Sequence, residues 1–255
     1  MRIVIKVGTS TLTYENGCVN IRNIEALCKI VSDMMNAGHQ VILVSSGAIG
    51  MGVGKLRLGE RPTDIAGKQA CAAVGQCELM YTYDKLFAEY SHTVAQILLT
   101  APDLASEDRH EKFKNTMTRL LELRVLPIIN ENDTVATEEI VFGDNDTLSA
   151  EVAVSVGAEL LILMSDIDGL FTKDPHKDSN ATLIREVHEL TDDIMSLAGK
   201  AGSKLGTGGM ETKLRAAKIA TGAGCDMVII NGSYPQRLYS VIEGECEGTR
   251  FYAKR

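Results

Sequence analysis

The sequence has no tryptophan and only 5 prolines in 255 residues. Its apolar runs are all shorter than the roughly 18 residues of a membrane-spanning helix, so we expect no contact with a membrane. A predicted strand begins at Arg2, which leaves no room for a secretory signal, and we expect a cytoplasmic protein. Apolar residues make up 45% of the chain and 23 residues are glycine, which is typical of a compact fold with many tight turns.

The six cysteines include no Cys-x-x-Cys pair and no Cys/His spacing typical of a zinc site. Most lie in apolar segments, so we interpret them as small buried side chains in a reducing compartment, and we predict no protein-held metal. The formal net charge of −8 argues against nucleic acid as a partner. An anionic substrate would therefore depend on a few well-placed cations and backbone amides.

Several common catalytic signatures are also missing. The sequence contains no Walker A spacing, no GxGxxG after a predicted strand, no HExxH and no Ser–His–Asp candidate. These absences argue against the P-loop and dinucleotide-binding classes and against metalloproteases and serine hydrolases.

Predicted strands and helices alternate along almost the whole chain. The strands are expected at 2–7, 41–44, 93–99, 125–129, 160–164, 227–230 and 249–252, and the helices at 21–37, 65–88, 108–123, 147–156 and 214–221. This alternation predicts an α/β fold, a three-layer αβα sandwich with a mainly parallel central sheet. We expect residues 1–255 to form a single domain.

The segment 130–151 is the most informative part of the sequence. It contains two clusters of Asp and Asn between a predicted buried strand and a predicted helix that has Asn145 or Asp146 near its cap. Sheets of this class bind ligands at the carboxyl ends of their strands. An Asp there can hold a substrate ammonium, and an Asn can bond either end of an amino acid. Taken alone, the segment fits a solvated acidic loop equally well.

Lys6 lies in an otherwise apolar predicted strand. Burying its ammonium group is costly without an anionic partner, which favours a place in a ligand site. The alternative is a lysine that extends into solvent from an edge strand. Gly8 and the hydroxyl residues after it could supply hydrogen-bond donors to a phosphate.

Three further segments follow strands or precede helices. Segment 45–52 is rich in small residues and suits an anion or carboxylate, although close helix–strand packing also explains its glycines. Segment 165–175 suits a purine or ribose pocket or a surface loop. The glycine-rich segment 206–213 precedes a helix and suits phosphate, with a flexible hinge as the alternative.

Five segments in order, IKVGTS, VSSGAIGMG, PIINENDTVATEEIVFGDND, SDIDGLFTKDP and GTGGMETKLRAAKIA, resemble the amino-acid kinase family. The pairing of NEND with GDND is similar to the glutamate 5-kinases within it. The motifs extend from residue 3 to about residue 230, and five in the right order are far more specific than one. The resemblance implies the amino-acid kinase fold and ATP-dependent phosphorylation of the γ-carboxylate of L-glutamate to L-glutamyl 5-phosphate, the first step of proline biosynthesis.

The resemblance also implies roles for individual residues. The catalytic residues would be Lys6 and Lys213, which neutralise phosphoryl oxygens, and Asp146, which holds both ammonium groups. The glutamate-binding residues would be Ser46, Gly47, Asn132, Asp133, Asp144 and Asn145. The ATP-binding residues would be Lys6, Gly8, Ser165, Asp166, Thr207, Gly208, Gly209, Met210, Glu211, Thr212 and Lys213, with Mg²⁺ bridging the phosphates.

The same resemblance implies feedback inhibition by proline at or near the glutamate site, a homo-oligomer, and glutamyl-phosphate reductase as a partner. Many glutamate 5-kinases carry a C-terminal PUA domain, and we expect none here because the chain ends soon after its last predicted strand. The alternatives are an acetylglutamate-, uridylate- or carbamate-type kinase, or a non-catalytic nucleotide or amino-acid binder. The presence of Lys6, Asp146 and Lys213 together argues against the binder.

Overall fold

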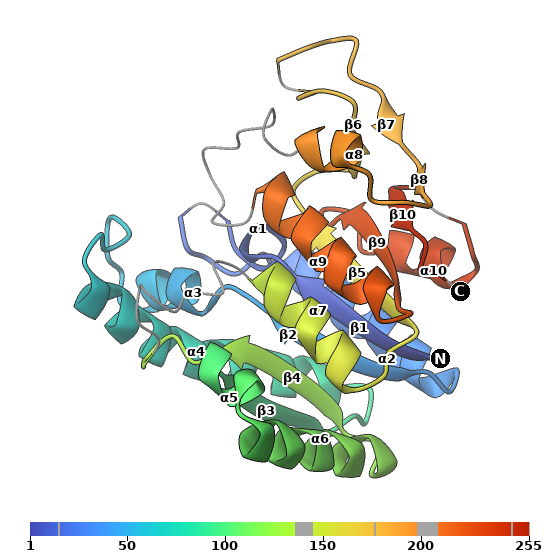
Figure 1. Cartoon of the computed structure of the whole chain (residues 1–255). Helices are drawn as coiled ribbons and strands as arrows, with labels where there is room; N and C mark the ends of the chain where they lie inside the picture. Colours follow the sequence, from blue (N-terminus) through green and yellow to red (C-terminus); the bar gives the residue numbers. More distant parts are fainter. Residues whose placement is uncertain (15, 136–144, 176, 198–208, 246, 255) are drawn as a thin grey trace.

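The computed structural model describes residues 1–14, 16–135, 145–175, 177–197, 209–245 and 247–254. Its centre is an eight-stranded sheet of order β3-β4-β2-β1-β5-β9-β10-β8 (Figure 1). The strands of this sheet are β1 (Arg2–Val7), β2 (Gln40–Ser45), β3 (Val94–Leu99), β4 (Leu126–Glu131), β5 (Leu160–Ser165), β8 (Glu186–Val187), β9 (Asp226–Asn231) and β10 (Thr249–Phe251). All neighbours pair in parallel except β9 and β10. A separate antiparallel pair joins β6 (Leu170–Phe171) to β7 (Leu183–Ile184).

Helices cover both faces of the sheet (Figure 1). One hydrophobic core contains side chains of α6 (Glu107–Glu122), α7 (Asn145–Ser155) and α9 (Met210–Gly222), with α5 (Ala101–Ala105) and α8 (Asp192–Ser196) packed at its margin. The other contains side chains of α1 (Thr9–Leu12), α2 (Ile21–Asn36), α3 (Ala48–Lys55), α4 (Ile65–Ala88) and α10 (Arg237–Ile242). The predicted three-layer αβα sandwich with a mainly parallel sheet is therefore confirmed.

Strand β1 lies in the middle of the sheet, between β2 and β5. Its side chains alternate between the two cores, with Val4 on one side and Ile3 and Ile5 on the other, as the period of a strand requires. Lys6 is therefore on a central strand, and the alternative of a lysine extending from an edge strand is wrong.

The long elements agree closely with the sequence prediction, and α4 has the predicted bounds. Helix α7 begins at Asn145, two residues before the predicted start, so Asn145 and Asp146 belong to its first turn. The two-residue strands β6, β7 and β8 were not predicted, because elements this short carry no measurable period.

The prediction that most cysteines are small buried side chains holds for Cys28, Cys71 and Cys225, which are buried. It is wrong for Cys18 and Cys77, which are exposed. Both lie at positions facing solvent, Cys18 in the hairpin after α1 and Cys77 on the outer side of α4. Cys246 lies outside the described residues.

Two glycines allow α3 and α4 to cross with their backbones in contact. A Cβ added at Gly75 would overlap the carbonyl oxygen of Ala48, and one added at Gly52 would overlap that of Cys71. Segment 45–52 thus owes some of its glycines to close packing, but of helix on helix rather than helix on strand. Gly47 has a different role: its φ of 101° turns the chain from β2 into α3, a conformation that favours glycine.

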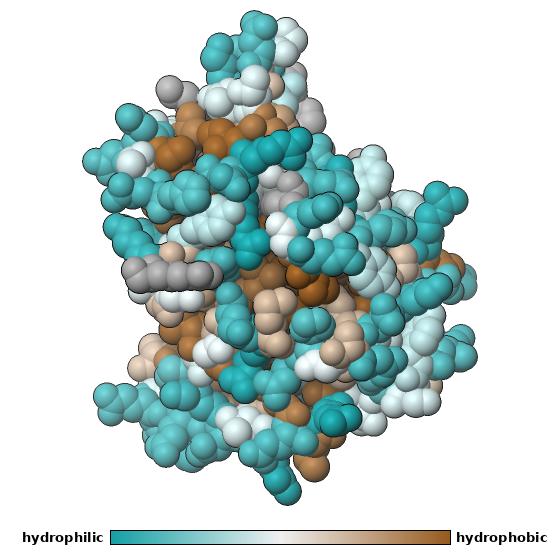
Figure 2. All heavy atoms as spheres, turned by 90° about the vertical axis from the view of Figure 1, so that its right-hand side faces the viewer, coloured by the Kyte–Doolittle hydropathy of each residue, from teal (hydrophilic) through white to brown (hydrophobic). Residues whose placement is uncertain are grey.

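Hydrophilic residues predominate on the face of the molecule in Figure 2, and apolar residues gather there in a few smaller groups. Among the described helices, none has the length and apolar character needed to cross a bilayer.

Candidate active site

Parallel strands bring five chain segments to one edge of the sheet. Val7 at the end of β1 pairs with Ser45 at the end of β2 and with Met164 near the end of β5, and Leu99 of β3 pairs with Glu131 of β4. Residues that follow these strands lie at the carboxyl edge, where sheets of this type bind ligands. The predicted residues Gly8, Ser46, Asn132 and Asp166 are among them.

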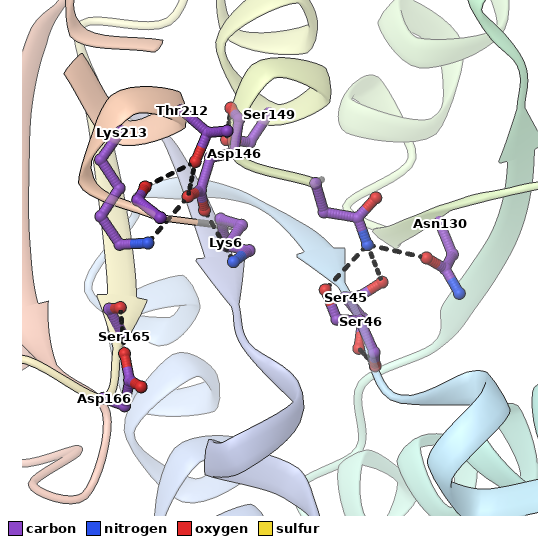
Figure 3. A network of polar contacts seen from close by, with 12 residues as sticks. Lys6, Ser45, Ser46, Asn130, Asp146, Ser149, Ser165, Asp166, Thr212 and Lys213 are labelled. Carbon is purple, nitrogen blue, oxygen red and sulfur yellow. Dashed lines mark hydrogen bonds and ion pairs between the residues drawn. The ribbon is translucent and has the colours of Figure 1, made fainter. Parts of the chain in front are cut away.

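The lysine–aspartate cluster, formed by Lys6, Asp146 and Lys213, lies at this edge (Figure 3). Lys6 Nζ is 2.6 Å from one carboxylate oxygen of Asp146, and Lys213 Nζ is 3.0 Å from the other. The Asp146 side chain is fully buried and the lysine side chains are 9% and 4% exposed. Three elements far apart in the sequence, β1, α7 and α9, thus place three charges together.

The charges explain the ionisation of Asp146. Burial alone would raise its pKa, but the two ammonium groups and their hydrogen bonds outweigh burial and hold the pKa below its usual range. Its place in the first turn of α7 also favours a negative charge. With two cations and one anion, the cluster keeps one net positive charge, which suits it to phosphoryl oxygens.

Helix α9 begins beside the cluster. Its N-cap is Gly209, and Thr212 in its first turn donates from Oγ1 to the Gly209 carbonyl oxygen at 2.7 Å and contacts Asp146 Oδ2 at 3.3 Å. Backbone amides at such a helix start can bind phosphate. The side chains of two predicted ATP-binding residues point elsewhere, since Met210 is buried in the core and Glu211 pairs with Arg215 at 3.5 Å, so these two residues could contact ATP through their backbone amides.

The amide network is a second polar group at the same edge (Figure 3). The side-chain nitrogen of Asn145 donates toward Ser46 Oγ at 2.9 Å and toward the Ser45 carbonyl oxygen and Asn130 Oδ1, both at 3.0 Å. Asn130 Nδ2 in turn donates to Gln76 Oε1 at 2.9 Å. Because Asn145 and Asp146 are consecutive, the first turn of α7 joins the amide network to the lysine–aspartate cluster.

Asn132 and Asp133 follow β4. Asn132 Oδ1 accepts a hydrogen bond from Thr134 Oγ1 at 2.6 Å, which fixes its side chain within the turn. Burial raises the pKa of Asp133, and the positive charge of Arg61 only partly offsets this. A carboxylate held in a poorly solvated place would gain from a bound cation.

Ser165 ends β5 and Asp166 follows it, on the other side of the lysine–aspartate cluster (Figure 3). Ser165 Oγ donates to Asp166 Oδ1 at 3.0 Å, and its carbonyl oxygen accepts from Gly232 N at 2.7 Å. Gly8 lies close to β5, and a Cβ there would stand 3.3 Å from the Met164 carbonyl oxygen and 3.8 Å from Lys6 Nζ. A substituent at Gly8 would therefore fill space beside the ammonium group of Lys6.

A model of the amino acid kinase family matches residues 1–231. The chain belongs to the amino acid kinase family. It is similar over nearly its whole length to proteins named glutamate 5-kinase. That of Clostridium tetani is 57% identical over 251 residues, which cover 98% of this chain and 94% of the relative, and that of Clostridium perfringens is 54% identical over 258 residues, which cover 100% and 96%. That of Carboxydothermus hydrogenoformans is 53% identical, but this chain covers only 68% of it.

Solved structures agree on the fold. A carbamate kinase from Giardia lamblia bound to AMP-PNP superposes with a TM-score of 0.69 at 15% identity, covering 99% of this chain and 98% of that one. An isopentenyl phosphate kinase superposes with a TM-score of 0.68 at 16% identity, covering 98% and 100%. At these identities the likeness shows the amino acid kinase fold alone.

Some predicted site residues lie outside the described part of the chain, namely Asp144, Thr207 and Gly208. Conversely, the structure adds residues to the edge that the sequence did not name individually as site residues. Asn130, Gln76, Ser45 and Tyr83 join the amide network, and Tyr83 OH lies 3.0 Å from Ser45 Oγ. Asn130 and Ser45 lie in segments predicted to bind a ligand, whereas Gln76 and Tyr83 lie in the helix predicted at 65–88.

Proposed function

We propose that this member of the amino acid kinase family transfers the γ-phosphoryl group of ATP to the γ-carboxylate of L-glutamate, giving L-glutamyl 5-phosphate for proline biosynthesis. The observation that carries the proposal is the buried Asp146 between Lys6 and Lys213. The similarity to glutamate 5-kinases over nearly the whole chain supports glutamate as the acceptor.

In this reaction a γ-carboxylate oxygen attacks the terminal phosphorus of ATP, the bond to the bridging oxygen breaks, and ADP leaves. No general base is needed, because a carboxylate of ordinary pKa, about 4.3, is already ionised at neutral pH. Catalysis then depends on position and on neutralising the phosphoryl oxygens. Lys6 and Lys213 supply the positive charge, and Asp146 holds the two ammonium groups in place.

The two substrates occupy opposite sides of the lysine–aspartate cluster in this proposal. Glutamate binds at Ser46, Gly47, Asn132, Asp133, Asp144 and Asn145, with Asp133 facing the α-ammonium group. ATP binds at Gly8, Ser165, Asp166 and the segment 207–213. The raised pKa of Asp133 fits this role, since a bound ammonium group would replace the missing solvation of its carboxylate.

Mg²⁺ fits the site as an ion carried by ATP. Within the described ranges, no group of three or more His, Cys, Asp or Glu residues could hold a metal, and Asp146 already pairs with two lysines. Mg²⁺ commonly binds through substrate phosphates and water rather than an all-protein cage. When bound, it would neutralise phosphate charge, while the residues of this chain orient the acceptor and the transferring group.

The decisive experiment measures ADP release with ATP and Mg²⁺, comparing L-glutamate with N-acetyl-L-glutamate, L-aspartate and UMP, with and without hydroxylamine. Activity with glutamate alone, with hydroxamate formed from the trapped acyl phosphate, is the expected result. Activity with N-acetyl-L-glutamate would contradict the role of Asp133, because that substrate has no ammonium group. Tight ATP binding without turnover on any acceptor would indicate a non-catalytic binder.

Regulation and assembly extend the proposal. Proline inhibits at or near the glutamate site, the chain acts as a homo-oligomer of single-domain subunits, and unstable glutamyl phosphate passes to glutamyl-phosphate reductase. A glutamate titration with and without proline tests the first point, and unchanged apparent affinity and rate would exclude it.

A further inference from the structure

Gln76 stands out on α4 because it is polar in a helix whose neighbouring turns bury Leu79, Tyr83 and Phe87 in the core. The residue is only 8% exposed. Burying a side-chain amide is costly unless its hydrogen bonds are satisfied. Its oxygen accepts from Asn130 Nδ2 at 2.9 Å, and this bond is the first link of a chain that leads toward the acceptor pocket.

The orientation of the Asn130 amide is determined from two sides. Its Oδ1 accepts from the backbone N–H of Glu131 at 2.9 Å, and a backbone N–H can only donate. The NH₂ end must then face an acceptor, which Gln76 Oε1 provides. If the Asn130 amide were rotated, its NH₂ group would meet the N–H of Glu131 and the NH₂ of Asn145.

The orientation of Asn145 is supported by Asn130 together with the Ser45 carbonyl oxygen, which can only accept. The NH₂ group of Asn145 has two hydrogens and faces three acceptors, one of which is Asn130 Oδ1. Because the two ends of an amide point in opposite directions, its carbonyl oxygen is turned away from β2 and β4. In the proposed pocket this oxygen is the end that can accept a hydrogen bond from the substrate ammonium group.

We propose that Gln76 is a positioning residue for the acceptor substrate. It holds the amide of Asn130, which holds the amide of Asn145, and it thereby presents the carbonyl oxygen of Asn145 to the amino acid. The inference rests on the proposed function and deepens it, because it assigns amino-acid affinity to a helix that the sequence motifs do not include. Loss of Gln76 weakens glutamate binding and leaves ATP binding unchanged, since none of the hydrogen bonds described for Gln76 reaches the lysine–aspartate cluster.

The test compares two substitutions at this position. Gln76→Met keeps an unbranched side chain but removes the acceptor, and Gln76→Glu keeps an oxygen facing Asn130 Nδ2. Loss of one buried hydrogen bond that orients a binding group predicts about a tenfold rise in the KM for glutamate with Gln76→Met. Gln76→Glu should stay within about threefold of the wild-type value, and the KM for ATP should change less than about twofold in both variants.

The matched control is Thr82→Val, which removes a different hydrogen bond of α4, from Thr82 Oγ1 to the Glu78 carbonyl oxygen. It should leave both KM values unchanged. Thermal unfolding of all variants separates a positioning effect from a general loss of packing. If Gln76→Met does not fold, Gln76→Glu still carries the test, because a tenfold rise in its glutamate KM would overturn the proposal.

The wild-type protein is assayed first, with hydroxylamine. Failure to form hydroxamate overturns the proposed function and, with it, the proposed role of Gln76. Hydroxamate from the wild type together with an unchanged glutamate KM in Gln76→Met overturns the role of Gln76 alone. An equal rise in the KM for glutamate and ATP would likewise contradict it, because that pattern indicates a structural defect.

Discussion

Asp146 has two oxygens and each contacts a different lysine. Single residues of the lysine–aspartate cluster therefore have separable effects. Removing a lysine takes away charge that acts on the phosphoryl group in the proposed reaction, whereas removing the aspartate charge leaves two buried ammonium groups without their anion.

Lys213→Ala should lower kcat by about 10²–10³-fold and change the KM for glutamate by less than about threefold, because its charge matters most in the transition state. Steady-state kinetics with both substrates checks this. Lys218→Ala, at an exposed position of the same helix, is the control and should behave as wild type. A rise in KM with normal kcat would remove Lys213 from phosphoryl transfer.

Asp146→Asn should lower kcat and reduce the free energy of unfolding by about 3–5 kcal/mol, as when one partner of a buried ion pair is lost. Because its folded-state pKa is depressed, the stabilisation by Asp146 is present above the unfolded-state pKa of about 3.9 and is lost as pH falls through the lower folded-state value. Urea unfolding at several pH values measures this. Asp108→Asn, in the exposed pair with Lys112, should have little effect; an equal loss in both variants would contradict the prediction.

Asp133→Asn should stabilise the substrate-free protein at neutral pH while raising the KM for glutamate by about 10–100-fold, the range expected for a lost charged hydrogen bond. Its folded-state pKa is raised by burial, so the cost of ionised Asp133 is absent below the unfolded-state pKa of about 3.9 and grows as pH rises through the folded-state value. Unfolding at acid and neutral pH checks the sign. A pure kcat defect would speak against contact with the ammonium group.

The sequence predicted part of this site for physical reasons. A buried lysine needs an anion, so Lys6 was identifiable, and its pairing with Asp146 followed from the family resemblance. The bond between Gln76 and Asn130 was not predictable, because it joins a helix to the end of a strand 54 residues further along the chain, and only the fold brings them together.

At the level of elements, the crossing of α3 and α4 positions the proposed acceptor side. Gly47 is the N-cap of α3, and Gln76 follows Gly75 at the contact between the two helices. Segment 65–88 was correctly predicted to be a helix. The sequence could not show why Gly75 must be glycine, because the atom that a Cβ there would overlap is the carbonyl oxygen of Ala48 in another helix.

Gly75→Ala should force α4 away from α3, lower the free energy of unfolding by about 1–3 kcal/mol as overpacking does, and raise the KM for glutamate. Thermal unfolding and kinetics measure both effects. Gly222→Ala is the matched control, since a Cβ there meets nothing within 4 Å, and it should be neutral or slightly stabilising. Wild-type stability in Gly75→Ala would show that the crossing adjusts freely.

The eight-stranded sheet is continuous, so the proposed glutamate and ATP sides share its central strands. The alternation of elements made this architecture predictable. The placement of β8 beside β10 was not predictable, because a strand of two residues is defined only by its pairing with a neighbouring strand.

Glutamate and a non-hydrolysable ATP analogue should each raise the midpoint of the same single unfolding transition, since a ligand of the folded state stabilises the entire cooperative unit. Differential scanning calorimetry with each ligand checks this. Two transitions, each shifted by only one ligand, would show that the two sides unfold independently.

The central position of β1 has a consequence for synthesis on the ribosome. This strand is made before its neighbour β5 and before Asp146, whose carboxylate accompanies Lys6. An early fragment would have to bury an ammonium group with no anion near it, which is costly. Newly made β1 should therefore remain unpaired until α7 has left the exit tunnel. Truncated products that end before Asn145 should remain sensitive to proteases.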